Sequence, residues 1–248
     1  MDIYDSKVVA IEEALNKIKS NDVIFCGLAA CEPSMFLGSL HLIKDQVQIV
    51  SVITGILGGE YDYFSDPGMY GHFTNKTWMY TSGCRAAHPH QTVSYLPVEI
   101  HKLGHYLLDA YHPNVFVGCA APMDKNGHFS LSLSTMIEKE CIEQADLVIL
   151  EVNPNLPRTY GDTHVHISQV DLLIESENPI PVQKPPGFGE KDRIIGEYVA
   201  DLVEDGSTIQ LGVGGIPAAV AQCLKGKRDL GVHSGLLNDS LLDLYEAG

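Results

Sequence analysis

The 248-residue sequence has no long apolar run, since none of its hydrophobic stretches approaches the roughly 18 residues that a membrane-spanning helix needs. Residues 1–20 have instead the pattern of an amphipathic helix, with Val8, Ile11 and Leu15 on one face. A start of this kind is not a signal peptide. We therefore expect a cytoplasmic protein without a membrane segment.

Paired cysteines and positive charge are also scarce. Six cysteines are scattered without a CxxC pair in a chain too long to need disulfides, which predicts reduced and mostly buried thiols. Lysine and arginine together number 16 against 32 aspartates and glutamates, so the net charge is −16. This charge argues against nucleic acid as a partner, and an anionic small molecule would need donors local to its site.

Several catalytic motifs are absent. The sequence has no GxSxG nucleophile elbow and no Walker phosphate loop, and GVGGIP has Pro217 where a dinucleotide-binding motif has its last glycine. His164 and His166 share a face at strand spacing, but two imidazoles are too few to hold a metal. His88 and His90 flank a proline without a carboxylate nearby. We expect structural histidines and no metal site.

The most informative stretch present is TIQLGVGGIPAAV, residues 208–220, which predicts a buried strand, a tight loop and a helix. Gly212, Gly214 and Gly215 free the backbone of the loop, and Pro217 suits the first turn of the helix. Such a turn directs backbone N–H groups and a helix dipole at one point, which suits an oxyanion, a phosphate or a thioester carbonyl. In α/β proteins it is more often a packing device.

A second copy of this pattern occurs earlier in the chain. Residues 18–40 align with residues 202–224, with a glycine and a proline at matching places and a one-residue insertion. Further along, VSVITGIL at 50–57 aligns with LGVHSGLL at 230–237. The chain therefore contains a duplicated unit. Because the second copy stops in mid-pattern at Gly248, we expect a truncated product or a fragment.

Predicted strands and helices alternate along the chain, which indicates an α/β fold with open, mainly parallel sheets, the second of them incomplete. Four prolines in residues 179–189 predict a linker between domains at 1–185 and 186–248. Residues 58–75 are rich in Gly, Asp, Tyr and Pro and predict a long surface loop. Residues 78–82 predict a further strand. The other predicted strands are 23–27, 47–53, 115–120 and 145–152, and the predicted helices are 33–40, 99–111, 137–144 and 193–204.

Several ordered stretches carry a family resemblance: SYLPVEI at 94–100, CAAPMDKNGHFSLSLS at 119–134, ADLVILEVNPNLPRTYGDTHVHISQVD at 145–171 and VADLVEDGSTIQLGVGGIPAAV at 199–220. They resemble the acetyl-CoA hydrolase/transferase family, the branch of class I CoA-transferases that includes 4-hydroxybutyrate and butyrate CoA-transferases. The resemblance implies two similar α/β halves with CoA-transferase-like folds and an active site between them.

The resemblance also implies a mechanism. A glutamate attacks an acyl-CoA thioester to give a mixed anhydride and then a glutamyl-CoA thioester, from which CoA passes to a carboxylate. By this likeness Gly212, Gly214 and Gly215 line the thioester, and the loop around Asn153 and Gly161 borders the pocket. Coenzyme A thioester is then a substrate and no cofactor is permanently bound. The expected partners are acyl-CoA and a carboxylate, with homo-oligomerisation left open.

The chain departs from the family pattern at the nucleophile. The family's glutamate ends a segment like GIHTE, whereas this chain reads GVHSGLLND and has Gly235 in that place. The catalytic nucleophile is therefore unknown, and its neighbours are His233, Ser234 and Asp239. The family's C-terminal region, with most of the CoA-binding surface, would follow residue 248.

Three interpretations remain. The first is a CoA-transferase or acyl-CoA hydrolase that uses another nucleophile or water, acting on short-chain acyl-CoA and acetate or a related carboxylate. The second is an inactive fragment that binds without turnover. The third is a small-metabolite binding module on a duplicated scaffold.

Overall fold

The computed structural model describes residues 3–182, 184 and 187–248. The chain forms two compact units, Met1–Pro181 (unit 1) and Val182–Gly248 (unit 2). The domain boundary predicted at residues 185 and 186 lies outside the described residues. In the described part of the chain, no helix is both long and apolar enough to cross a membrane.

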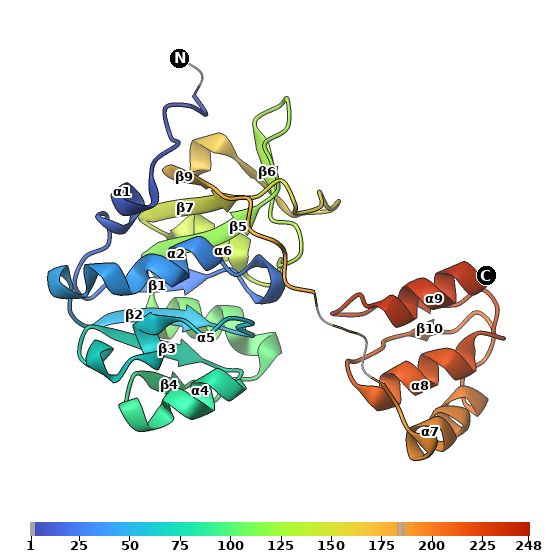
Figure 1. Cartoon of the computed structure of the whole chain (residues 1–248). Helices are drawn as coiled ribbons and strands as arrows, with labels where there is room; N and C mark the ends of the chain where they lie inside the picture. Colours follow the sequence, from blue (N-terminus) through green and yellow to red (C-terminus); the bar gives the residue numbers. More distant parts are fainter. Residues whose placement is uncertain (1–2, 183, 185–186) are drawn as a thin grey trace. The chain divides into compact units, whose positions relative to one another are not determined.

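Unit 1 is built on a seven-stranded sheet with the strand order β4-β3-β2-β1-β5-β7-β9 (Figure 1). All neighbouring strands are parallel, so their carboxyl ends meet at one edge. The chain order reverses between β1 and β5, and such a reversal is where open α/β sheets usually bind ligands. The strands are β1 (Val23–Cys26), β2 (Val50–Thr54), β3 (Phe73–Thr77), β4 (Val93–Tyr95), β5 (Val115–Ala120), β7 (Leu147–Val152) and β9 (Leu172–Glu175).

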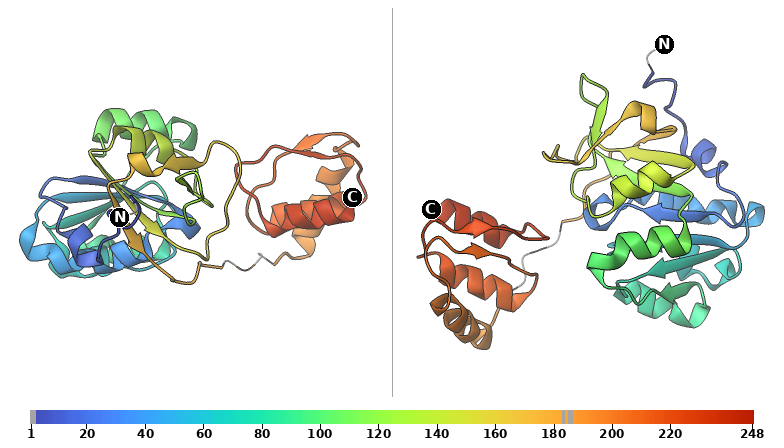
Figure 2. Two further views of the ribbon diagram at one scale, coloured as in Figure 1. Left: turned by 90° about the horizontal axis from the view of Figure 1, so that it is seen from above. Right: turned by 180° about the vertical axis from the view of Figure 1, so that it is seen from behind.

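Helices cover both faces of this sheet, as the left view of Figure 2 shows. Alternation along β1 explains the two layers, because Ile24 and Cys26 pack into one apolar core and Phe25 into the other. The first core contains side chains of α1 (Ile11–Leu15), α2 (Ser34–Ser39), α3 (Asp62–Ser65) and α4 (Ser82–Ala87). The second contains side chains of α5 (Leu103–Tyr111), α6 (Glu138–Gln144) and the antiparallel pair β6 (His128–Ser130) and β8 (His164–His166). Short 3-10 turns are η1 (Ala29–Cys31), η2 (Leu40–Gln46), η3 (Pro67–Met69), η4 (His88–His90), η5 (Ile100–Lys102) and η6 (Ile167–Gln169).

Unit 2 is smaller and has its own apolar core, which includes the buried side chains of Leu211, Ala221 and Leu224. Its two short strands are parallel. Its elements are α7 (Glu190–Asp201), β10 (Thr208–Ile209), α8 (Gly215–Leu224), β11 (Gly231–Val232) and α9 (Asp239–Ala247).

The predicted duplication is confirmed down to the register of strand pairing. In unit 1 Val23 of β1 lies opposite Ser51 of β2, and in unit 2 the aligned residues Thr208 and Gly231 lie opposite each other. Each parallel pair is connected through a helix. The predicted α/β class with duplicated, mainly parallel sheets is therefore confirmed.

The turns before the two first strands also match. Asn21 and Gly206 occupy aligned positions and both have positive φ, at 69° and 78°. The Asn21 amide donates to the Gln48 carbonyl at 3.0 Å, and the Gly206 amide donates to the aligned carbonyl of Arg228 at 2.9 Å. The two copies thus share a turn conformation that few residues adopt.

Two predictions between residues 58 and 82 are wrong. The predicted surface loop at 58–75 contains α3 and the start of β3, and its Tyr63 and Phe64 are buried in the first core. The predicted strand at 78–82 is not one, because β3 has already ended and Thr81 caps α4 by accepting the Cys84 amide. The aromatic residues pack inward because this stretch covers one face of the sheet.

Glu151 of β7 is a charged residue inside this fold, with a side chain only 1% exposed. Its Oε2 accepts the amides of Met35 at 3.1 Å and Phe36 at 3.3 Å, in the first turn of α2. Burial raises the pKa of Glu151 above its ordinary value, although these amides and Ser176 act in the opposite direction. The ionised carboxylate of Glu151 accepts hydrogen bonds from backbone amides that have no partner within α2. Its charge is nevertheless unfavourable, because the side chain is buried away from water.

We expect Glu151 to make the protein less stable as pH rises. The pKa of Glu151 is raised in the folded chain, so its protonated form stabilises the fold relative to the unfolded chain. This contribution to the free energy of unfolding is fully present below the ordinary pKa of a carboxyl group and is lost as pH rises through the pKa of the folded state. Urea unfolding of the wild type and of Glu151→Gln across mildly acidic to neutral pH measures this contribution. The stability of wild type relative to variant should fall with pH, and parallel profiles would contradict the assignment.

Candidate functional site

The glycine loop at residues 212–217 follows β10 and leads into α8, as predicted. The prediction of a buried strand is wrong for β10, because Thr208 is exposed and Ile209 is half-buried. Gly214 precedes the helix with φ 130°, which side-chain-bearing residues rarely adopt. A Cβ on Gly215 would come within 3.1 Å of the Gly187 carbonyl oxygen and 3.2 Å of Asp192 Oδ2. Gly212 has more room, since its Cβ would make ordinary contact with Pro217 at 3.6 Å.

The segment after β11 is hydrogen-bonded to this glycine loop. Ser234 Oγ donates to the Leu211 carbonyl at 3.1 Å, and Asn238 Nδ2 donates to the Gly212 carbonyl at 3.3 Å. Gly235 lies between these two anchoring residues in the sequence and is exposed. The structure thus brings Gly235, where the resemblance predicts the nucleophile, and the glycine loop together at the carboxyl edge of one strand pair.

Nothing in the local backbone requires glycine at position 235. Its φ is outside the left-handed range, and an added Cβ would meet no atom within 4 Å. The aligned residue of the first copy, Gly55, differs, because its Cβ would lie 2.6 Å from a ring carbon of Trp78. A side chain therefore fits at residue 235 and does not fit at the matching place in unit 1.

His233 and Asp239 flank this position and are exposed. The His233 amide donates to the Ile209 carbonyl at 3.0 Å and continues the strand pairing. Asp239 is the first residue of α9, where a carboxylate suits the helix dipole. Among the described residues, no side-chain hydrogen bond or ion pair joins His233 to Asp239, nor do three or more His, Cys, Asp or Glu side chains gather as a metal would need.

Asn153 and Gly161, expected at the border of the pocket, lie at the two ends of the loop between β7 and β8. Asn153 is buried, and its Nδ2 donates to the Asn178 carbonyl at 2.8 Å while its Oδ1 accepts the Asn155 amide at 2.9 Å. Gly161 is exposed with φ 98°. The side chain of Asn153 thus shapes its own loop, and Gly161 allows the turn at the far end.

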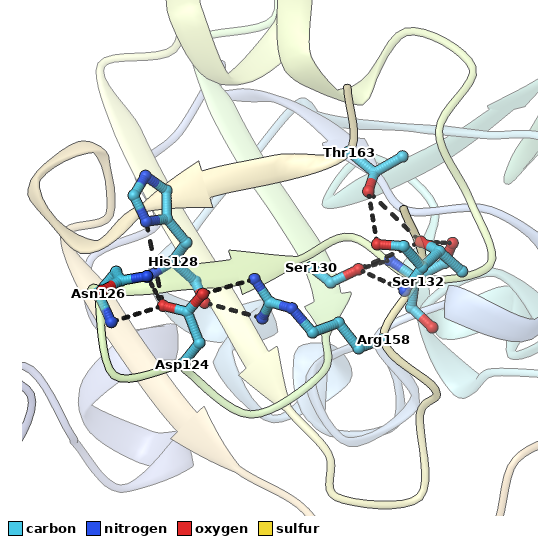
Figure 3. A network of polar contacts seen from close by, with 8 residues as sticks. Asp124, Asn126, His128, Ser130, Ser132, Arg158 and Thr163 are labelled. Carbon is cyan, nitrogen blue, oxygen red and sulfur yellow. Dashed lines mark hydrogen bonds and ion pairs between the residues drawn. The ribbon is translucent and has the colours of Figure 1, made fainter. Parts of the chain in front are cut away.

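A polar network holds the middle of this loop (Figure 3). Arg158 pairs with Asp124 at 2.8 Å and donates to the His128 carbonyl at 3.2 Å, while Ser130 Oγ accepts the Thr159 amide at 3.1 Å. The backbone hydrogen bond from His128 contributes most to lowering the pKa of Asp124. The loop is therefore attached to the turn around β6 rather than free in solvent.

His166 of β8 behaves as a structural residue, whereas the buried Nε2 of His164 has no hydrogen-bond partner among the described residues. His166 Nδ1 lies 2.8 Å from Ser168 Oγ, and its ring contacts that of His128 with centroids 5.0 Å apart. His166 also caps η6 by accepting the Ser168 amide. The Nδ1 atom of His166 is therefore used in hydrogen bonds within the local turn.

Glu32 is a buried carboxylate near these loops that was not identified as a candidate site residue from the sequence. It precedes Pro33 in the first copy, where the second copy has Ile216 before Pro217, and its side chain is buried. Glu32 accepts the amides of Gly58 at 2.8 Å and Gly59 at 3.0 Å. The carboxylate thereby ties the loop after β2 to the loop after β1. The presence of a charged residue in the otherwise apolar stretch GLAACEP could have indicated a buried polar site.

Gly214→Val should destabilise the start of α8, because valine at φ 130° is strained by about 1 kcal/mol or more. Hydrogen exchange of the α8 amides reports the local opening free energy. Gly226→Val is a matched control, since Gly226 has open space around it and no positive φ. Equal exchange in the two variants would show that the glycine loop tolerates side chains.

Comparisons with known proteins identify the family of the chain. Residues 2–183 match the family model described as the acetyl-CoA hydrolase/transferase N-terminal domain. The chain is 34% identical over 249 residues to the 4-hydroxybutyrate coenzyme A transferase of Clostridium kluyveri, covering 100% of this chain and 58% of that protein. It is 30% identical to the butyryl-CoA:acetate CoA-transferase of Anaerostipes caccae, covering 99% of this chain and 56% of that protein.

A solved structure gives the same result. The crystal structure of RipA from Yersinia pestis superposes with a TM-score of 0.93 at 28% identity, over 100% of this chain and 61% of that chain. The chain thus spans somewhat more than half the length of the relatives it matches. Because the family model covers most of the chain and the resembling stretches continue beyond it, the chain belongs to the acetyl-CoA hydrolase/transferase family.

Proposed function

We propose that this chain supplies the thioester-binding loop of an acyl-CoA:carboxylate CoA-transferase or an acyl-CoA hydrolase. The observation that carries the proposal is the hydrogen-bonded contact between the Gly235 segment and the glycine loop, through Ser234 and Asn238. Backbone N–H groups at the start of α8 are suited to an oxyanion that forms on a thioester carbonyl. The substrates are an acyl-CoA and a carboxylate, and no cofactor is permanently bound.

The proposed site lacks a nucleophilic side chain at residue 235. Covalent transfer needs a carboxylate oxygen that attacks the thioester carbon, and glycine has none. Water can take its place: its oxygen bonds to the thioester carbon, the C–S bond breaks, and one water proton leaves with the CoA thiolate as thiol. His233, exposed beside Gly235, is the residue we assign to accept and return that proton.

We propose CoA-transferase-like domains at residues 1–185 and 186–248, and a substrate-binding role for the loop around Asn153 and Gly161. Asp239 helps to hold the attacking water. We further propose a cytoplasmic enzyme without membrane or nucleic-acid partners.

A binding protein without turnover is the second candidate, and Gly235 is the observation that favours it. The two candidates differ in their products when the protein from the complete reading frame is incubated with butyryl-CoA, with and without acetate. Transfer gives acetyl-CoA only with acetate and releases no free thiol. Hydrolysis releases thiol in both cases, and the second candidate gives saturable binding alone. Absence of any butyryl-CoA binding would contradict the proposed function.

A further inference from the structure

The turn at residues 124–128, which leads into β6, has an asparagine followed by a glycine near its tip. Asn126 and Gly127 form the only Asn-Gly pair in the sequence. Asn126 is exposed, and Gly127 has φ 81°, in the left-handed range that glycine adopts readily. Because glycine has no side chain, its backbone nitrogen can approach the side-chain carbonyl carbon of a preceding asparagine with little steric hindrance. The pair is therefore a candidate for chemical modification.

Hydrogen bonds within the turn hold it closed. The Asp124 amide donates to the His128 carbonyl at 2.9 Å, and the Gly127 amide donates to the Asp124 carbonyl at 3.0 Å. Asp124 Oδ1 also accepts the amides of Asn126 and His128, each at 2.9 Å. The N–H group of Gly127 is thus engaged within the turn, and its nitrogen becomes free to react when the turn opens.

Arg158, in the loop between β7 and β8, binds both residues at the ends of this turn. Its Nη2 donates to Asp124 Oδ2 at 2.8 Å, and its Nη1 donates to the His128 carbonyl at 3.2 Å (Figure 3). The guanidinium thus links the two ends of the turn through a carboxylate and a backbone carbonyl. Because opening of the turn breaks these contacts, they add to the free energy that opening requires.

We propose that Asn126 is a site of spontaneous deamidation and that Arg158 limits the rate of this reaction by keeping the turn closed. When the turn opens, the Gly127 nitrogen bonds to Cγ of Asn126, the Cγ–Nδ2 bond breaks, and ammonia leaves with the proton of the Gly127 amide. Water then adds to one of the two carbonyl carbons of the cyclic imide and breaks its bond to nitrogen, which takes up a proton from the water. The product is aspartate or isoaspartate at residue 126, each with one new negative charge.

Either product should loosen the turn. The new carboxylate belongs to the residue whose amide binds Asp124, so two negative charges come close together at one guanidinium. Isoaspartate also adds a carbon atom to the backbone after residue 126, which changes the spacing of the hydrogen bonds that close the turn. Because Arg158 belongs to the loop around Asn153 and Gly161, the modification should also weaken the attachment of that loop.

Incubation of the folded chain in mildly alkaline buffer, followed by peptide mapping by mass spectrometry, tests the proposal. The peptide that contains residue 126 should gain about one dalton, at least about tenfold faster than the peptides that contain the other asparagines. Arg158→Ala should make this conversion about fivefold faster, because the open turn becomes more populated. Arg158→Lys keeps the charge but has no planar fork to bind both ends of the turn, so it should give a smaller increase.

Arg193→Ala is the matched control, since it removes an arginine of α7 that is ion-paired with Glu190. It should leave the rate at residue 126 unchanged. In concentrated urea, wild type and Arg158→Ala should convert at one rate, because the turn is unfolded in both. Retention of Asn126 in the folded chain over a period in which the other asparagines convert would overturn the inference, as would equal rates for Arg158→Ala and Arg193→Ala.

Discussion

Gly235→Glu should increase the CoA-transferase activity of the protein. The space around residue 235 is open and its φ is compatible with any side chain, so the carboxylate can be introduced without strain. A covalent nucleophile typically accounts for rate factors of about 10³ or more, which binding and oxyanion contacts do not replace. Acetyl-CoA formation from butyryl-CoA and acetate measures the gain.

Gly235→Gln is the control for this experiment. Glutamine fills the same space and keeps a polar end group, but its amide is a poor nucleophile. If the glutamate variant transfers no faster than the glutamine variant, Gly235 marks a different chemistry from that of the family. If both variants lose butyryl-CoA binding, the side chain blocks the glycine loop.

Gly55→Ala should destabilise unit 1, although Gly235→Ala at the aligned place should have almost no effect. A Cβ on Gly55 would lie 2.6 Å from Trp78 Cζ2 and 3.0 Å from Leu28 Cδ2, both in a packed core. Overpacking of this kind costs about 1–3 kcal/mol, whereas a methyl group in open space costs a few tenths at most.

Trp78 is the chain's one tryptophan and lies in the second core, so its fluorescence during urea unfolding reports the stability of unit 1. Amide exchange in α9 reports the stability of unit 2 for Gly235→Ala. Equal losses in the two variants would mean that glycine is required at both places, and that Gly235 is retained for the fold rather than in place of a nucleophile.

Much of the fold could be predicted from the sequence, because β5 is an unbroken apolar run of the kind that parallel sheets bury on both faces, and β7 is apolar except for Glu151. The internal repeat predicted two similar units, and the two copies do pair in one register, but the order of the strands could not be predicted from it. Strand β3 could not be found this way. Its sequence FTNKT has one apolar residue, and its buried positions include Asn75 and Thr77, whose side chains are satisfied by hydrogen bonds within the core.

The predicted N-terminal helix shows a second reason why sequence patterns did not give the whole fold. Within the described part of the predicted amphipathic helix, only Ile11–Leu15 is α-helical, and Val8 forms a parallel bridge with Leu173 instead. Tertiary contact at the sheet edge therefore overrides the helical period. For the candidate site, the glycine loop and Gly235 were identified from the repeat and the resemblance. Glu32 was not, because its partners Gly58 and Gly59 become neighbours only when the two loops fold together.

The central claim is that the thioester is bound at the glycine loop without a covalent partner at residue 235. Incubation with butyryl-CoA, reduction with borohydride and peptide mapping by mass spectrometry test it most directly, since a glutamyl-CoA thioester leaves a reduced side chain at the residue that formed it. The wild type should show no modified carboxylate, and Gly235→Glu should be modified at residue 235. A modified glutamate elsewhere in the wild type would contradict the account, because it would place the nucleophile at another residue.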